Sequence, residues 1–255
     1  MDFDLSEEQR LLKESIDGLL NDSYDFDARK KYQKEKGGWS KAVWGKLAEQ
    51  GLLGLPFAEA DGGFGAGAVE TMIVMEALGK ALVLEPYLAT VVIGGGFLRR
   101  GGSAEQKAAY ISGIIDGSKS FAFAQLEKNS RYDLNDVSTS AKKKGSGWVI
   151  DGEKFVVING ENADTLIVTA RTRGGQRDTS GIGVFLVPGN AKGVTRKGYP
   201  TRTACMPPTS PSPASRSAPM PRSAIPRTAC PWSSAWWTKP APRCARKRSA
   251  RWMNR

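Results

Sequence analysis

The run 103–126, SAEQKAAYISGIIDGSKSFAFAQL, contains the change of periodicity that decides the fold. Its first part predicts an amphipathic helix, because Ser103 and Gln106 have the spacing of a capping box and apolar residues follow at helical intervals. From Ser118 onward the pattern becomes that of strands, and FAFAQL is short and apolar. We therefore predict a boundary between a helical domain, 1–117, and a strand-rich domain, 118–201.

The segment before this boundary predicts helices only. Ser6 begins another capping-box pattern, Ser-Glu-Glu-Gln, and leucines follow it at helical spacing. A second helix ends at Gly51, and the apolar segment 68–101 predicts two helices interrupted near Pro86. Helices without strands over this length indicate a bundle.

The segment after the boundary consists of short runs rich in β-branched residues. These are STSAKKK, GWVIDGEKFVVING, ADTLIVTART and GIGVFLVPG, and glycine, asparagine or aspartate separates them. Lys142 to Lys144 precede Gly145, which is typical of a hairpin turn. The fold class predicted is α+β, with an all-α domain followed by an antiparallel β-barrel middle domain.

The composition changes again after Thr201. The chain of 255 residues has 37 basic and 26 acidic side chains, but residues 202–255 contain 11 of the basic ones and no acidic one. Subtracting these 11 from 37 leaves 26 basic residues against 26 acidic ones, so the body is neutral. Its charge therefore gives no reason to expect a nucleic-acid partner.

Metal and membrane sites are not expected either. The chain has no histidine, and its three cysteines lie in the proline-rich segment 202–255 without metal-ligand spacing. No stretch approaches the roughly 20 apolar residues of a membrane span, and the opening Met-Asp-Phe-Asp is unlike a signal peptide. We expect a cytoplasmic protein.

Several motifs, in order, resemble the acyl-CoA dehydrogenase family. They are DFDLSEEQRLL, LAEQGLLGLPFAEADGGFGAG, GGSAEQKAAYISGIIDGS and DGEKFVVINGENADTLIVTART, and the resemblance covers residues 1 to about 201. It implies an N-terminal helical domain, a middle β domain and a C-terminal helical bundle. It also implies FAD as cofactor, acyl-CoA as substrate, an electron-transfer flavoprotein as acceptor, and a homo- or hetero-oligomer with another subunit of the family.

The family's flavin motif, A-x-T-E-P-x-A-G-S-D, falls on residues 124–133, AQLEKNSRYD. Three positions match the family, namely Glu127, Asp133 and the following Thr139. However, Leu126 stands where the family has the threonine that faces the ring, and Tyr132 stands where it has the serine. A second motif, W-I-T/S-N-G, falls on 156–160, VVING. The resemblance implies flavin contacts from the following residues: Phe123, Gln125, Leu126, Tyr132, Val156, Val157 and Ile158. It implies substrate contacts from Tyr132 and Asp133.

These departures leave two interpretations open. Leu126, Val156 and Ile158 stand where the family has a hydroxyl, a tryptophan and a hydroxyl, and each lost hydroxyl bond would typically remove about 0.5–1.5 kcal/mol. One interpretation is a diverged but competent enzyme that holds the flavin through its backbone. The other is the small, flavin-motif-poor subunit of a heteromeric enzyme of the pimeloyl-CoA dehydrogenase type, either contributing to the reaction or serving only as a structural subunit.

A change of reading frame after Thr201 is the hypothesis that explains the tail. Restoring one nucleotide there allows the codons from Thr201 onward to be re-read as a sequence that begins TQDGLHAADITFTGVEV, an acidic strand pattern like that of the family. We expect 202–255 to be a frameshifted, disordered basic tail and the C-terminal helical bundle to be missing. No catalytic residue is assigned, because the family's catalytic glutamate usually lies in that bundle. The alternative, a tail that binds nucleic acid, predicts salt-sensitive DNA binding.

Overall fold

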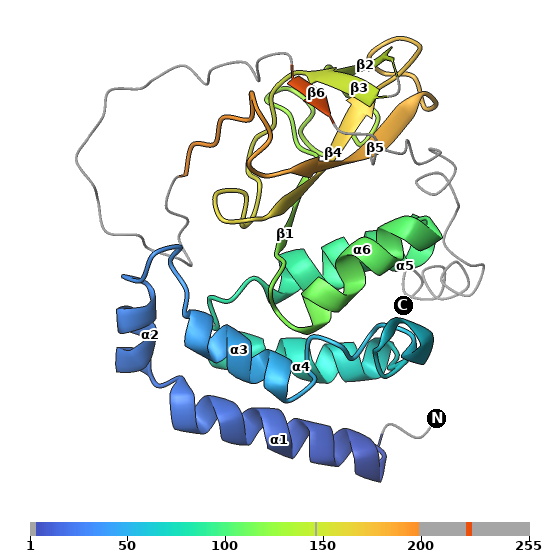
Figure 1. Ribbon diagram of the computed structural model, residues 1–255. Coiled ribbons are helices and arrows are strands. Elements are labelled where there is room, and N and C mark those ends of the chain that lie inside the picture. The colour runs from blue at the N-terminus through green and yellow to red at the C-terminus, as the bar shows by residue number, and fades with distance from the viewer. Residues whose placement is uncertain (1–3, 146, 199–222, 226–255) are drawn as a thin grey trace, which may run out of the picture.

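The computed structural model describes residues 4–145 and 147–198, and the backbone of 223–225. A layer of helices lies against a sheet domain, and strand β1 descends from the sheet toward the helices (Figure 1). The helices are α1 (Glu7–Ser23), α2 (Phe26–Tyr32), α3 (Lys41–Glu49), η1 (Glu59–Asp61), α4 (Ala68–Lys80), η2 (Leu88–Gly94), α5 (Gly95–Gly101) and α6 (Ala104–Ile115). The strands are β1 (Phe121–Ala124), β2 (Ser140–Lys144), β3 (Gly147–Asp151), β4 (Thr165–Arg171), β5 (Ile182–Pro188) and β6 (Ser223–Ile225).

Both predicted capping boxes are confirmed. Ser6 accepts a hydrogen bond from the N–H of Gln9 at 3.2 Å, and the Gln9 side chain accepts one from the Ser6 N–H at 3.0 Å. Ser103 and Gln106 make the same pair of bonds at the start of α6. These bonds satisfy N–H groups that a helix start leaves without partners, which is why both helices begin where the sequence indicates.

The predicted interruption near Pro86 is also present. It separates α4 from η2, which is a π-helix. The Glu85 carboxylate accepts hydrogen bonds from the Tyr24 hydroxyl at 2.7 Å and from the Ser40 N–H at 3.1 Å. Because burial is the dominant effect, the pKa of Glu85 is raised. This buried carboxyl ties the interruption to the ends of α1 and α3.

Glycines allow η2 and α5 to approach their neighbours closely. A Cβ on Gly94 would lie 2.7 Å from the Phe121 Cβ, and one on Gly95 would lie 2.5 Å from the Phe57 ring. Phe57 and Phe121 are completely buried. Only glycine fits at these two positions without a steric clash, and the close packing that it allows places η2 against β1.

Replacing Gly95 by alanine is expected to lower the free energy of unfolding by about 1–3 kcal/mol, because the added methyl group overpacks a rigid core. Gly18 in the exposed part of α1 has no atom within 4 Å of its Cβ position. Gly18→Ala is thus the matched control and should be stabilised by up to about 1 kcal/mol. Urea unfolding measures both changes, and equal responses would contradict the packing argument.

The sheet differs from the predicted antiparallel barrel in two respects. It is mixed, because β1 pairs with β4 in parallel, whereas β4–β5, β2–β3 and β3–β6 are antiparallel. It is also open, because no pairing among the described strands closes the order β1-β4-β2-β3-β6 into a ring. β2 also pairs with β4 in parallel, at Ser140 and Arg171. These parallel pairings arise because the chain makes the whole β2–β3 hairpin before β4 begins, and so returns to the end of the sheet where β1 began.

The hairpin prediction is confirmed, and of the strand-like run 147–160 only Gly147–Asp151 forms a strand. Residues 142–144 of β2 pair with 147–149 of β3, and Gly145 in the connection has φ +59°. The following residues leave the sheet, because Gly152, Val156 and Asn159 have φ values of +156°, +50° and +60°. Positive φ is incompatible with a regular strand, so the apolar run FVVI forms an irregular segment instead.

The sheet residues alternate between two cores. Ile167, Val184 and Leu186 pack into the core of the helical domain, whereas their neighbours Leu166 and Phe185 pack into a second core. This is the period of two that a strand imposes on its side chains. The sheet therefore contributes to both the interdomain packing and its own separate core.

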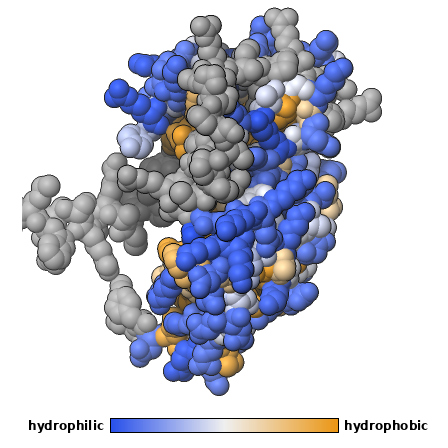
Figure 2. All heavy atoms as spheres, turned by 90° about the vertical axis from the view of Figure 1, so that its left-hand side faces the viewer, coloured by the Kyte–Doolittle hydropathy of each residue, from blue (hydrophilic) through white to orange (hydrophobic). Residues whose placement is uncertain are grey.

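On the face of the helical domain that Figure 2 displays, hydrophilic side chains predominate and hydrophobic ones form small separate groups. In the part of the chain that the structure describes, no helix is long and apolar enough to cross a membrane. The prediction of a disordered tail at 202–255 lies outside the described residues, apart from the backbone of β6.

Candidate functional site at the junction of the two domains

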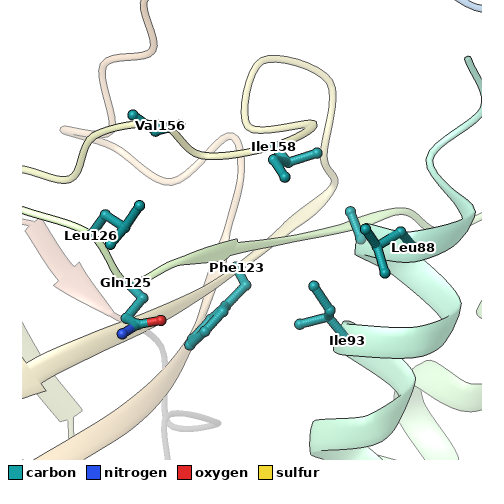
Figure 3. A pocket seen from close by; sticks show the side chains of 8 residues that line it. Leu88, Ile93, Phe123, Gln125, Leu126, Val156 and Ile158 are labelled. Carbon is teal, nitrogen blue, oxygen red and sulfur yellow. The ribbon is translucent and has the colours of Figure 1, made fainter. Parts of the chain in front are cut away.

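A cavity of about 150 Å³ lies where η2 meets the sheet domain. One wall comes from η2, one from β1 and its continuation, and one from the irregular segment after β3 (Figure 3). The lining residues are Leu88, Ala89, Ile93, Phe123, Gln125, Leu126, Val156 and Ile158. The cavity is thus apolar except for the Gln125 amide.

Five of the seven predicted flavin contacts meet in this cavity. They are Phe123, Gln125, Leu126, Val156 and Ile158. The other two lie elsewhere, since Val157 packs beside the second core and Tyr132 is 98% exposed. Asp133, the other predicted substrate contact, is exposed beside it. What these residues bind stays a prediction.

The helical wall was missed by sequence reasoning. Leu88 and Ile93 are five residues apart, and a π-helix places residues at this spacing on the same face. The run LATVVIG has a single polar residue, Thr90, which is buried and so does not mark an exposed face, and a period of 3.6 does not select these two side chains. A break after Pro86 followed by an apolar pair at this spacing is the signal that could have found them.

The side chains of the cavity do not fit the polar edge of a flavin ring. Leu126, Val156 and Ile158 stand at the three ring-facing positions of the family's motifs, and none can donate or accept a hydrogen bond. They are 36%, 57% and 61% exposed, so they present apolar surface to whatever occupies this site. Backbone N–H groups of these residues do not depend on side-chain identity and are the donors that such a segment can offer.

The cavity offers no acid–base chemistry by itself. None of its eight lining residues titrates. General acid–base catalysis requires a titratable group within hydrogen-bonding reach of the substrate. The described residues therefore form a binding surface at this cavity and supply no general base to it.

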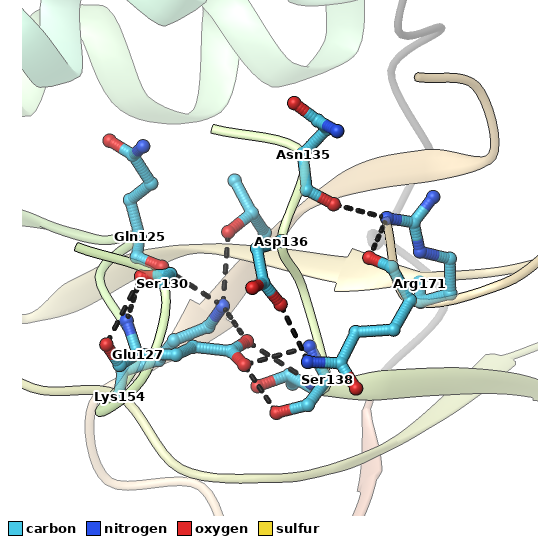
Figure 4. A network of polar contacts seen from close by, with 11 residues as sticks. Gln125, Glu127, Ser130, Asn135, Asp136, Ser138, Lys154 and Arg171 are labelled. Atoms are coloured by element: carbon cyan, nitrogen blue, oxygen red, sulfur yellow. Dashed lines mark hydrogen bonds and ion pairs between the residues drawn. The ribbon is translucent and has the colours of Figure 1, made fainter. Parts of the chain in front are cut away.

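A buried ion pair supports the cavity wall from within the sheet domain (Figure 4). The Lys154 Nζ lies 2.7 Å from Glu127 Oε1, and the two side chains are only 2% and 6% exposed. Burial acts to raise the pKa of Glu127, but hydrogen bonds from Lys154 and Ser138 outweigh it and hold the pKa at about 2. Burial lowers the pKa of Lys154, and the pairing with Glu127 opposes this. The Glu127 carboxyl is therefore ionised at neutral pH and lies within ion-pair distance of Lys154.

Arg171 organises the neighbouring loop. Its guanidinium donates to the carbonyl oxygens of Asn135 and Gln176, both at 2.6 Å, of Ser180 at 2.7 Å and of Asp178 at 2.9 Å. Arg171 is only 7% exposed. One charged side chain thus holds the 176–180 loop against the segment that precedes β2, where Figure 4 places Asn135 and Arg171 side by side.

The chain thus folds as a helical domain followed by a mixed sheet, with an apolar cavity at their junction. Two family models match the chain: the acyl-CoA dehydrogenase N-terminal domain over residues 6–118 and the acyl-CoA dehydrogenase middle domain over residues 122–209. The chain belongs to the acyl-CoA dehydrogenase family, whose members are flavin-dependent oxidoreductases of fatty acid oxidation.

A curated relative aligns with most of this chain. It is 31% identical over 194 residues to acyl-CoA dehydrogenase FadE12 of Mycobacterium tuberculosis, an alignment that covers 74% of this chain and 48% of that protein. The chain thus spans about half the length of this curated relative.

Two solved structures share the fold. The ChsE4–ChsE5 complex from Mycobacterium tuberculosis has a TM-score of 0.73 at 23% identity, covering 92% of this chain and 60% of that one. The FAD complex of PigA has a TM-score of 0.71 at 24% identity, covering 92% and 59%. FAD is the cofactor of this family.

Proposed function

We propose that this chain is the flavin-motif-poor subunit of a heteromeric acyl-CoA dehydrogenase. The observation that carries the proposal is the apolar character of Leu126, Val156 and Ile158 at the ring-facing positions of the cavity. The lack of a titratable side chain in the cavity lining supports it. So does the existence, among proteins of this fold, of a complex between two differently named chains.

The reaction of the assembled enzyme is the family's desaturation. An acyl-CoA thioester would lose a proton from its α-carbon to a base of the partner subunit and a hydride from its β-carbon, and FAD would supply the hydride acceptor. Electrons would pass to an electron-transfer flavoprotein. In the assembly, the residues of this chain would bind and orient apolar groups and exclude water, while its partner would supply the polar contacts to the ring. A cytoplasmic location stays a prediction.

Expression of the chain with its reading frame restored, alone and together with a catalytic homologue, tests the proposal. We expect the lone chain to purify without the visible absorbance band of flavin and the co-expressed pair to carry it. A lone chain that retains stoichiometric FAD and oxidises an acyl-CoA would favour the diverged, competent enzyme. A pair whose activity survives replacement of Leu126, Val156 and Ile158 by alanine would favour a purely structural subunit.

The frame change is part of this proposal. Sequencing the DNA over the codons for residues 199–204 tests it directly. We expect one additional nucleotide after the codon for Thr201 in a correctly read gene. If the DNA sequence is unchanged, the gene encodes this tail. The desaturase activity would then belong to the chain's relatives and not to this chain.

Restoring the family's ring-facing residues should restore flavin binding. In the variant Leu126→Thr, Val156→Trp, Ile158→Thr, two hydroxyl groups would together contribute about 1–3 kcal/mol, which corresponds to about 5- to 150-fold in affinity for FAD. Quenching of flavin fluorescence measures the dissociation constant. Leu11→Thr, at an exposed leucine of α1, is the control, and an equal gain there would contradict the assignment of the site.

A further inference from the structure

The Lys154–Glu127 ion pair connects segments that are distant in sequence. Glu127 accepts hydrogen bonds from the Ser138 N–H at 2.7 Å, from the Ser138 hydroxyl and from the Thr139 N–H at 3.1 Å. Lys154 also donates to the Thr169 hydroxyl on β4 at 3.1 Å. The pair therefore binds the continuation of β1 and the irregular segment after β3 to the strands beneath them.

Both partners are next to residues of the cavity wall. Glu127 directly follows Gln125 and Leu126, and the Gln125 carbonyl accepts a hydrogen bond from Lys154 at 3.2 Å. Lys154 precedes Val156 and Ile158 by two and four residues. The ammonium group thus contacts one wall segment while its own backbone belongs to the other.

Few other bonds join these two wall segments. The Phe155 N–H donates to the Leu126 carbonyl at 2.8 Å, which is the backbone bond between them among the described residues. The backbone of Val156 opposes this arrangement, because a β-branched residue rarely adopts a φ of +50° and is strained there. An arrangement that is strained locally must be imposed by contacts from outside the segment, and the ion pair makes such contacts.

We propose that the Lys154–Glu127 pair is a positioning device that sets the separation of the two sheet-side walls and thereby determines which groups the cavity accepts. The inference concerns the geometry of the cavity and does not depend on the proposed function. If the pair contributed only to stability, its replacement would leave the geometry of the cavity unchanged. Replacing a buried ion pair by apolar residues of similar volume is often neutral or stabilising. The walls, however, would lose the bonds that hold them together.

The test separates stability from cavity geometry. The double variant Lys154→Met, Glu127→Leu should unfold in urea at a midpoint close to that of the unchanged chain. Benzene is the probe, because apolar cavities of this size bind it. Shifts of the methyl NMR signals of Leu126, Ile158 and Ile93 should give a dissociation constant for benzene that is weaker by about tenfold or more in the double variant.

A matched control is the exposed pair of α4, in which the Lys80 and Glu76 side chains are 61% and 53% exposed. The variant Lys80→Met, Glu76→Leu makes the same chemical change away from the cavity and should leave benzene binding unchanged. Equal benzene affinities in the Lys154–Glu127 double variant and the unchanged chain, at equal stability, would overturn the proposal.

A second variant serves if the double variant does not fold. Lys154→Arg keeps the charge and changes the shape of the head group, so the fold should persist while the walls move. We expect the methyl signals of Leu126, Val156 and Ile158 to shift and those of the buried Ile114 to stay in place. Unchanged signals at all three wall residues would mean that the pair does not position them.

Discussion

Replacing Lys154 by methionine is expected to lower the free energy of unfolding by about 3–5 kcal/mol. The substitution leaves the Glu127 carboxylate buried without its cation, and an unpaired buried charge is among the most costly defects in a folded protein. Urea unfolding at neutral pH measures the loss. Adding Glu127→Leu should recover most of the lost free energy of unfolding, because the double variant leaves no unpaired charge buried.

The effect of Lys154→Met should depend on pH. The folded pKa of Glu127 is about 2, below the ordinary value of 4.5, so its ionisation contributes stability that is present above pH 4.5 and lost as the pH falls toward 2. The difference between the folded and the ordinary pKa of Glu127 corresponds to about 3 kcal/mol of folding stability. Without Lys154 the Glu127 carboxyl should protonate more readily. The difference in free energy of unfolding between the variant and the unchanged chain should therefore become smaller in acid. If this difference in free energy of unfolding stayed constant from neutral to acidic pH, the ion pair would not be its cause.

Replacing Arg171 by methionine should lower the free energy of unfolding by about 3 kcal/mol or more. The variant loses four hydrogen bonds from a charged donor, each worth about 1.5–3 kcal/mol when intact, and water entering the loop would offset part of that loss. Hydrogen exchange adds a local measurement. The Val137 N–H bonds to the Gln176 carbonyl at 3.0 Å, and its protection should fall when the loop is released.

Arg173 provides the control for this prediction. It lies between β4 and the 176–180 loop and is exposed, so Arg173→Met changes the net charge in the same way without removing a buried donor. We expect a change in the free energy of unfolding within about 0.5 kcal/mol. If the two variants were equally stable, the loop would be held by other contacts and the role assigned to Arg171 would be wrong.

The candidate site could be predicted only in part. The two runs around Leu126 and Val156 were found because they align with the family's motifs, and the structure brings five of their residues into one cavity. Tyr132 was assigned by alignment as well, but it is almost fully exposed and does not line the cavity, and Arg131 before it has φ +47°. Alignment gives the order of residues along the chain, whereas one left-handed residue changes the direction that the next side chain takes.

The sequence by itself determined that helices come first and that strands follow them. Capping boxes, helical periodicity and strand alternation are interactions among residues a few positions apart, so they can be seen in the printed chain. Only the tertiary structure decided that the sheet is mixed and open, that η2 forms the third wall of the cavity, and that Lys154 pairs with Glu127, which is 27 residues away. These features depend on which distant segments pack together, and close packing is a property of the whole fold.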